Sequence, residues 1–123
     1  MRNLQQLDTD APILQKTIEL YKEFYGYLKT FPKKDQYLLG KRCEDAILEF
    51  TEYIVMAASS SKERKLRLLE AANGKFDLLK VLLRVAREFK MLDNKKYLSL
   101  EAKMQEIGRM LGGWIRSLMT KTP

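Results

Sequence analysis

Apolar residues recur at alternating three- and four-residue intervals in four long stretches of this chain. That interval matches the turn of an α-helix, so each stretch predicts an amphipathic helix with one buried seam. We expect the helices at residues 11–30, 34–58, 62–91 and 94–119. Because only short links separate them, the pattern predicts an all-α fold. It is a single domain over residues 1–123, an up-down-up-down four-helix bundle.

Residues with capping preferences define the expected helix ends. Asp10 is a candidate N-cap for the first helix, and Pro12 fits its first position, where a missing N–H costs little. Pro32 ends the first pattern. The serines at 59–61 form a link and can cap the third helix, while Asp93-Asn94 caps the fourth.

The seams themselves are the candidate core. They are Leu14, Ile18, Tyr21, Tyr25 and Leu28 in the first helix; Leu39, Cys43, Ala46, Phe50, Tyr53 and Ala57 in the second; Leu69, Phe76, Leu79, Leu83 and Ala86 in the third; and Tyr97, Leu100, Met104, Ile107, Leu111, Trp114 and Leu118 in the fourth. Asn73-Gly74 usually signals a turn, but the apolar period stays in phase across it. We therefore favour one continuous third helix over a break.

The third helix has a second apolar face. At 100° per residue, Leu78, Leu82, Val85 and Phe89 lie roughly opposite the predicted core seam. One bundle core can bury only one of these faces. The second face is therefore expected to pack against another subunit in a homo-oligomer, or else to be covered by loops or by the N-terminal residues.

Several catalytic designs are excluded by composition. With no histidine and one cysteine, the chain cannot build a Ser-His-Asp triad, a Cys-His pair or a thiolate zinc cluster. It has no phosphate-binding Gly-x-x-x-x-Gly-Lys loop, and Glu44-Asp45 and Glu49-Glu52 fit solvated helix faces. We therefore expect a binding protein and not an enzyme, with no catalytic residue, metal site or cofactor.

The chain also lacks membrane and redox signals. No apolar run reaches the roughly 20 residues that a membrane span needs, and the polar first residues do not resemble a signal peptide. We expect a cytoplasmic protein that does not interact with membranes. Cys43 lies among apolar positions, so it is expected to be a small buried hydrophobe and not a reactive thiol.

Positive charge is concentrated in the second half. Residues 1–60 hold 8 Lys and Arg against 9 Asp and Glu, whereas residues 61–123 hold 15 against 7. The candidate nucleic-acid-binding residues are Lys62, Arg64, Lys65 and Arg67 at the start of the third helix, Lys80, Arg84 and Arg87 along it, and Lys95 and Lys96 at the start of the fourth. Such residues can neutralise phosphates without reading sequence. The alternative is an ordinary solvated face with a few ion pairs.

Three glycines interrupt the fourth helix. Gly is about 1 kcal/mol worse than Ala inside a helix, so Gly108, Gly112 and Gly113 need a packing reason. We interpret them as sites of close helix approach, with Trp114 anchoring the core or a subunit contact. Arg109 and Arg116 on the same helix are weaker candidates for the basic surface.

Several segments resemble one family across nearly the whole chain. They are Phe24-Tyr25, Thr30-Phe-Pro-Lys33, Tyr37-Leu-Leu-Gly-Lys-Arg42, Leu79-Lys-Val-Leu-Leu-Arg84 and, most specifically, Ile107-Gly-Arg-Met-Leu-Gly-Gly-Trp114. Together they are similar to the accessory variability determinant (Avd) proteins of diversity-generating retroelements. The resemblance implies a four-helix bundle in a barrel-like homopentamer with a basic surface. It also implies binding to the element's reverse transcriptase and to RNA or DNA, in support of mutagenic cDNA synthesis, with no catalytic site.

A second family has the same expected fold and pentamer, namely the proteins encoded in intervening sequences of large-subunit ribosomal RNA genes. Its Asn-Ile-Ala-Glu-Gly string is absent here, where Tyr53-Ile-Val-Met-Ala-Ala-Ser-Ser60 stands instead. This departure favours the retroelement accessory protein. The alternative function is an oligomeric interaction scaffold, or an intervening-sequence-type protein without a retroelement role.

Overall fold

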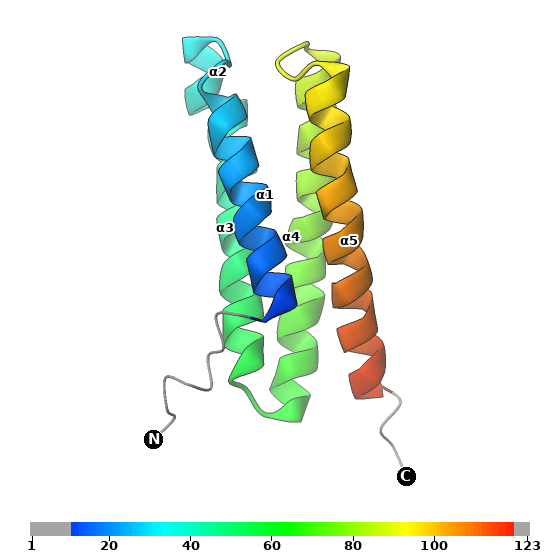
Figure 1. Ribbon diagram of the computed structural model, residues 1–123. Helices are drawn as coiled ribbons and strands as arrows, with labels where there is room; N and C mark the ends of the chain where they lie inside the picture. The colour runs from blue at the N-terminus through cyan, green and yellow to red at the C-terminus, as the bar shows by residue number, and fades with distance from the viewer. Residues whose placement is uncertain (1–10, 120–123) are drawn as a thin grey trace.

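The structure, a computed structural model, describes residues 11–119. Four long helices and one short helix follow one another: α1 (Pro12–Leu28), α2 (Lys33–Tyr37), α3 (Leu39–Ala58), α4 (Lys62–Glu88) and α5 (Asn94–Met119). The long helices alternate in direction and lie side by side (Figure 1). Each packs against two others, α1 and α4 both contacting α3 and α5. The predicted up-down-up-down four-helix bundle is confirmed within the single chain.

The first helix begins at the predicted proline. Pro12 occupies the first turn of α1, and Ala11 stands at the N-cap without a side-chain hydrogen bond. The proposed cap, Asp10, lies outside the described residues. The helix ends at Leu28 and not at residue 30.

The helix predicted over residues 34–58 is divided into two. Leu38 leaves the helical region at φ −108° and ψ −92°, so α2 ends before it and α3 starts after it. The chain turns back on α1 here, and Gln36 Nε2 donates to the Phe31 carbonyl at 3.0 Å. A Cβ at Gly40 would collide with the Leu28 side chain, so α3 starts in direct contact with the end of α1. We expected one helix because no proline after residue 32 marks this corner in the sequence. That expectation was wrong.

The third predicted helix is continuous but shorter than expected. Residues 73 and 74 remain helical because Leu69, Ala72 and Phe76 bury the same face on both sides of them. The helix ends at Glu88, three residues early. Lys90 adopts φ 64°, and the Met91 N–H donates to the Ala86 carbonyl at 2.8 Å, as in a Schellman motif.

One predicted cap is confirmed and one is wrong. The Lys96 N–H donates to Asp93 Oδ1 at 2.8 Å, which caps α5 at the predicted residue. Ser61 holds the N-cap position of α4 but makes no side-chain cap hydrogen bond. The hydroxyl of Ser60 instead donates to the Met56 carbonyl of the preceding helix at 2.7 Å.

The core follows three of the four predicted seams. Buried side chains of α3, α4 and α5 include Cys43, Ala46, Phe50, Ala57, Leu69, Phe76, Leu79, Leu83, Ala86, Leu100, Met104, Ile107 and Leu111, and Leu39, Tyr53, Tyr97, Trp114 and Leu118 are partly buried against them.

The seam predicted for α1 is confirmed only in part: Leu14 is buried, and Tyr21 and Leu28 are partly buried against the core. Ile18 and Tyr25 are 46% and 51% exposed, while the neighbouring Leu20 and Phe24 are buried. The buried row includes Thr17, whose hydroxyl donates to the Ile13 carbonyl at 2.7 Å. A hydroxyl satisfied within the helix can occupy a core position, and the apolar pattern alone does not reveal this.

A partly buried carboxylate joins α1 to α5. Glu23, whose side chain is 14% exposed, pairs with Lys103 Nζ at 2.7 Å and accepts a hydrogen bond from the Tyr27 hydroxyl. Burial opposes ionisation of Glu23, but hydrogen bonds from Lys103, Ser99 and Tyr27 outweigh it and lower the pKa of the carboxyl group.

We expect Glu23→Gln to destabilise the fold by about 1–2 kcal/mol at pH 7, because it removes the charged partner of these donors. Because the pKa of Glu23 is lower in the folded than in the unfolded protein, the ionised carboxylate stabilises the fold above the ordinary glutamate pKa of 4.5. This stabilisation is lost as the pH falls through the folded pKa. The difference between wild type and variant should therefore shrink on acidification. Urea denaturation across pH measures this.

Glu19→Gln is the matched control, because Glu19 is 51% exposed and pairs with Lys16 at 3.7 Å. Such exposed pairs contribute at most about 1 kcal/mol. Equal losses from the two substitutions would contradict a special role for Glu23.

Candidate functional site

The bundle has a basic side formed by α4 and α5. Residues 62–119 hold 14 Lys and Arg against 7 Asp and Glu, whereas residues 12–58 hold 7 of each. Because α4 and α5 are neighbours, the excess charge of the described residues lies along one side of the molecule (Figure 1). A one-sided field of this sign attracts anionic partners.

The row Lys80, Arg84 and Arg87, which we call the basic stripe, lies on the α5-facing edge of α4. Lys80 pairs with Asp77 at 3.5 Å, and Arg84 pairs with Glu88 at 3.2 Å. The Arg87 guanidinium lies 4.3 Å from the centre of the Tyr97 ring on α5. Exposed pairs of this kind are weak, so Lys80 and Arg84 can exchange a carboxylate for a phosphate at little cost.

The nine predicted nucleic-acid-binding residues do not form one surface. Lys62, Arg64, Lys65 and Arg67 start α4 beside the α3–α4 connection, whereas Lys95 and Lys96 start α5 at the opposite end of the bundle (Figure 1). A 27-residue helix is about 40 Å long. The antiparallel packing of α4 and α5 therefore divides the set, and the basic stripe groups with Lys95 and Lys96.

Three lysines that the sequence analysis did not single out lie at this same end. Lys29, Lys33 and Lys34 surround the corner between α1 and α2, and all are exposed. Lys96 Nζ connects the two helix pairs, since it lies 5.4 Å from the centre of the Tyr27 ring on α1. These lysines lie close to Pro32 in the sequence. The sequence analysis missed them because residues 12–58 hold equal numbers of basic and acidic side chains.

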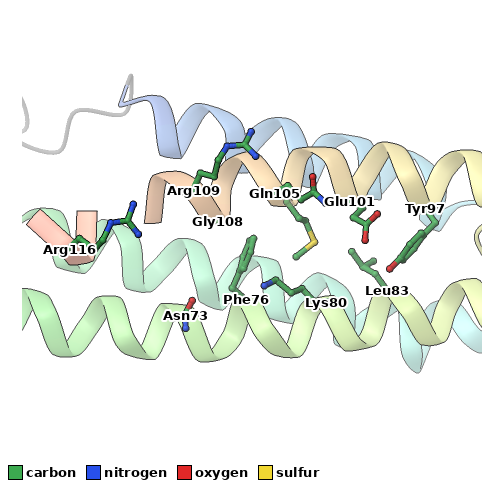
Figure 2. A pocket seen from close by; sticks show the side chains of 11 residues that line it. Asn73, Phe76, Lys80, Leu83, Tyr97, Glu101, Gln105, Gly108, Arg109 and Arg116 are labelled. Carbon is green, nitrogen blue, oxygen red and sulfur yellow. The ribbon is translucent and has the colours of Figure 1, made fainter. Parts of the chain in front are cut away.

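A groove of about 620 Å³ runs between α4 and α5. Its floor is apolar and consists of Phe76, Leu83 and Met104, with Tyr97 at one end. Its polar residues are Asn73, Glu101 and Gln105, and its cations are Lys80, Arg109 and Arg116. Figure 2 shows Phe76 rising from α4 toward α5 and Lys80 extending along α4 to Phe76, while Glu101 and Tyr97 point back toward α4. We call this feature the α4–α5 groove.

The glycines of α5 are explained only in part. A Cβ at Gly108 would lie 3.5 Å from Phe76 of α4, which is ordinary contact. At Gly112 and Gly113 the nearest atoms belong to the side chain of Arg116 on the same helix, at 3.3 and 3.9 Å. Close approach of another helix is therefore wrong for Gly112 and Gly113 within the described part of the chain. Gly108 lines the α4–α5 groove, which the bare helix surface helps to open.

The second apolar face of α4 is only partly covered by the described residues. We call Leu78, Leu82, Val85 and Phe89 the outer apolar stripe; the first three are half-buried and Phe89 is 71% exposed. Val81 beside it is 58% exposed. No loop among residues 11–119 covers this face. Its packing against another subunit stays a prediction.

The remaining chemistry-bearing groups offer little reactivity. Burial raises the pKa of the Cys43 thiol to about 12, so it stays protonated, as expected for a buried hydrophobe. Among residues 11–119, no group of three or more Asp, Glu or Cys side chains is placed to hold a metal ion. None of the described helices is long and apolar enough to cross a membrane.

A protein-family model described as bAvd-like matches residues 12–118. The match extends from the first residue of α1 to the last turn of α5, so it includes the basic stripe and the α4–α5 groove. No curated protein matches the chain.

We expect Gly112→Leu to leave the folded chain at least as stable as wild type. The new side chain would meet only the flexible Arg116 side chain, and Leu is about 1 kcal/mol better than Gly in a helix. Any damage should appear as a lower assembly mass. Urea denaturation and light scattering measure the two effects separately.

Gly26→Leu is the control, because an added Cβ there meets nothing within 4 Å and the residue is exposed on α1. A loss of several kcal/mol in the Gly112 variant alone would contradict the open surroundings of Gly112.

Proposed function

The chain belongs to the bAvd-like family, and we propose that it is a non-enzymatic accessory subunit of a diversity-generating retroelement. In this role it binds the element's reverse transcriptase and its RNA or DNA, and supports mutagenic cDNA synthesis. The observation that carries the proposal is the excess of cations on α4 and α5 in a chain that matches this family.

The basic stripe is the proposed phosphate-binding element. Its three cations lie at i, i+4 and i+7 on one edge of α4, so they can contact successive phosphates. Lys80 and Arg84 are exposed, and Arg87 is half-buried against Tyr97. Lys95 and Lys96 extend this surface across the connection to α5. The contacts release counterions and do not read bases, which suits a subunit that follows a template of any sequence.

The outer apolar stripe is the proposed contact between copies in a homo-oligomer, which we expect to be a pentamer. An exposed phenylalanine beside three half-buried aliphatic side chains is the type of surface that oligomers bury. Symmetry then repeats the basic stripe in every subunit and multiplies the attraction for a polyanion.

A second candidate function is an oligomeric interaction scaffold that binds no nucleic acid. It is favoured by the ion pairs of Lys80 with Asp77 and Arg84 with Glu88, which neutralise part of the stripe. In that case the cations would serve solubility and local pairing. The salt dependence of binding distinguishes the two functions.

We expect the triple variant Lys80/Arg84/Arg87→Glu to lose most duplex DNA affinity. Three lost phosphate contacts should also reduce the slope of log affinity against log salt by about 2–3. Fluorescence anisotropy of a labelled duplex over a salt titration measures both. Lys22/Lys41/Arg42→Glu is the control, because it makes the same charge change on α1 and α3. Equal losses from the two variants, or none, would contradict the stripe as the binding element.

For the assembly we expect Phe89→Glu to lower the particle mass in light scattering, because it places a charge in the outer apolar stripe. The variant should stay folded, since Phe89 is 71% exposed. Leu48→Glu on α3 provides the matched control at 47% exposure. A Phe89 variant with the wild-type mass would exclude this face as the contact.

A further inference from the structure

We propose that the corner between α1 and α2 binds unpaired nucleic acid, with one base stacked on the Tyr37 ring and the adjoining phosphates held by Lys33 and Lys34. The inference rests on the proposed function and names the form of nucleic acid that the protein takes at a site outside the basic stripe. The basic stripe cannot select single strands, because its cations contact phosphates and not bases.

The ring of Tyr37 is open to solvent. Tyr37 is the last residue of α2, and it is 68% exposed. Its side chain makes no hydrogen bond, ring contact or cation contact with any of residues 11–119. Most of the ring surface is therefore accessible to a ligand.

The other five tyrosines are covered or hydrogen-bonded within the fold. Cations lie 5.5, 5.4 and 4.3 Å from the ring centres of Tyr25, Tyr27 and Tyr97. The Tyr21 hydroxyl donates to Glu44 Oε2 at 2.7 Å, and Tyr53 is partly buried against the core. Tyr37 alone among the tyrosines of residues 11–119 lacks such a partner.

The corner that carries Tyr37 is held in place by other residues. Phe31 is 3% exposed, and its ring meets that of Phe24 edge-on at 6.0 Å. Gln36 Nε2 donates to the Phe31 carbonyl at 3.0 Å, and the Asp35 N–H donates to the Pro32 carbonyl at 2.8 Å. A base that stacks on Tyr37 therefore meets a preorganised surface, which lowers the entropy lost on binding.

Two cations stand beside the open ring. Lys33 and Lys34 lie four and three residues before Tyr37, so they share its side of the short helix. Both are exposed, and neither has an ion pair within residues 11–119. The only acidic side chain of residues 29–38 is the half-buried Asp35. An exposed aromatic ring beside unpaired cations is the combination with which proteins bind single strands.

The corner is continuous with cations of α5. The α1–α2 corner and the start of α5 lie at the same end of the bundle (Figure 1). Lys96 Nζ lies over the Tyr27 ring of α1, and Lys95 beside it is exposed. A strand with one base on Tyr37 can therefore continue along this end toward α5.

The ring makes the site selective for unpaired bases. In a duplex the bases are stacked on one another and paired, so the corner would meet phosphates only. In a single strand a base can leave its neighbours and stack on an aromatic side chain. Tyr37 therefore adds affinity for single strands and none for a duplex.

The test removes the ring and keeps every charge. Tyr37→Leu should fold as wild type does, because the side chain is 68% exposed. Tyr37→Phe retains a ring that can stack and serves as the conservative variant. Tyr25→Leu is the matched control, because it makes the same change at a 51% exposed tyrosine that already has Lys29 over its ring.

The probes are a labelled strand of twenty deoxythymidines and a labelled twenty-base-pair duplex, each titrated with protein by fluorescence anisotropy. We expect Tyr37→Leu to weaken single-strand binding at least about fivefold and to leave duplex binding and the single-strand salt slope unchanged. Tyr37→Phe and Tyr25→Leu should match wild type with both probes. Lys33/Lys34→Gln should instead lower the single-strand salt slope by about 1–1.5.

Four results would overturn the inference. They are wild-type single-strand affinity in Tyr37→Leu, an equal loss for both probes, an equal loss in Tyr25→Leu, and a lower particle mass of Tyr37→Leu in light scattering, which would assign the corner to contact between copies. The first result leaves the proposed function standing, because the basic stripe would still bind nucleic acid. Failure of the wild-type protein to bind either probe would instead contradict the proposed function itself.

Discussion

Burial of one continuous face of α4 determines how the rest of the molecule is arranged. That face carries Leu69, Phe76, Leu79, Leu83 and Ala86 over nearly the whole length of the helix. Once it is turned into the core, every other position on α4 has a defined direction. The basic stripe then lies on the edge toward α5, and the outer apolar stripe lies on the other edge, roughly 110° around the helix from the buried face. A break at Asn73-Gly74 would have uncoupled the two ends.

The same constraint places two weak surface ion pairs on one edge of α4. The exposed pairs Lys80–Asp77 and Arg84–Glu88 contribute little to stability. They are therefore poor candidates for holding the fold together, in contrast to the partly buried Glu23–Lys103 pair between α1 and α5. The ion pairs are divided in this way, one at a partly buried contact between α1 and α5 and the others along the edge of α4.

How much the sequence predicts depends on whether local signals agree. Both ends of α5 follow from the Asp93 cap and a regular seam, and both match the structure. Ile18 and Tyr25 were wrongly assigned to the α1 seam because two apolar stripes overlap in this helix. The buried stripe includes Thr17, whose hydroxyl donates to the Ile13 carbonyl. The break at Leu38 has no proline or cap beside it and is imposed by the return of the chain on α1. The candidate cations were found individually, but their division between two ends requires the antiparallel packing.

The α4–α5 groove was beyond sequence analysis because it depends on which faces of two helices approach each other. Its components had nevertheless been noticed as separate oddities, namely the basic residue Lys80, the glycine at 108 and the arginines at 109 and 116. The packing brings them together and changes the meaning of the glycine. Gly108 does not bring two helices unusually close, since an added Cβ would make only ordinary contact with Phe76. Its missing side chain instead leaves space in the α4–α5 groove that a larger residue would fill. At this position the helix loses about 1 kcal/mol of propensity, and the consequence is the shape of the groove and not a closer packing of α4 and α5.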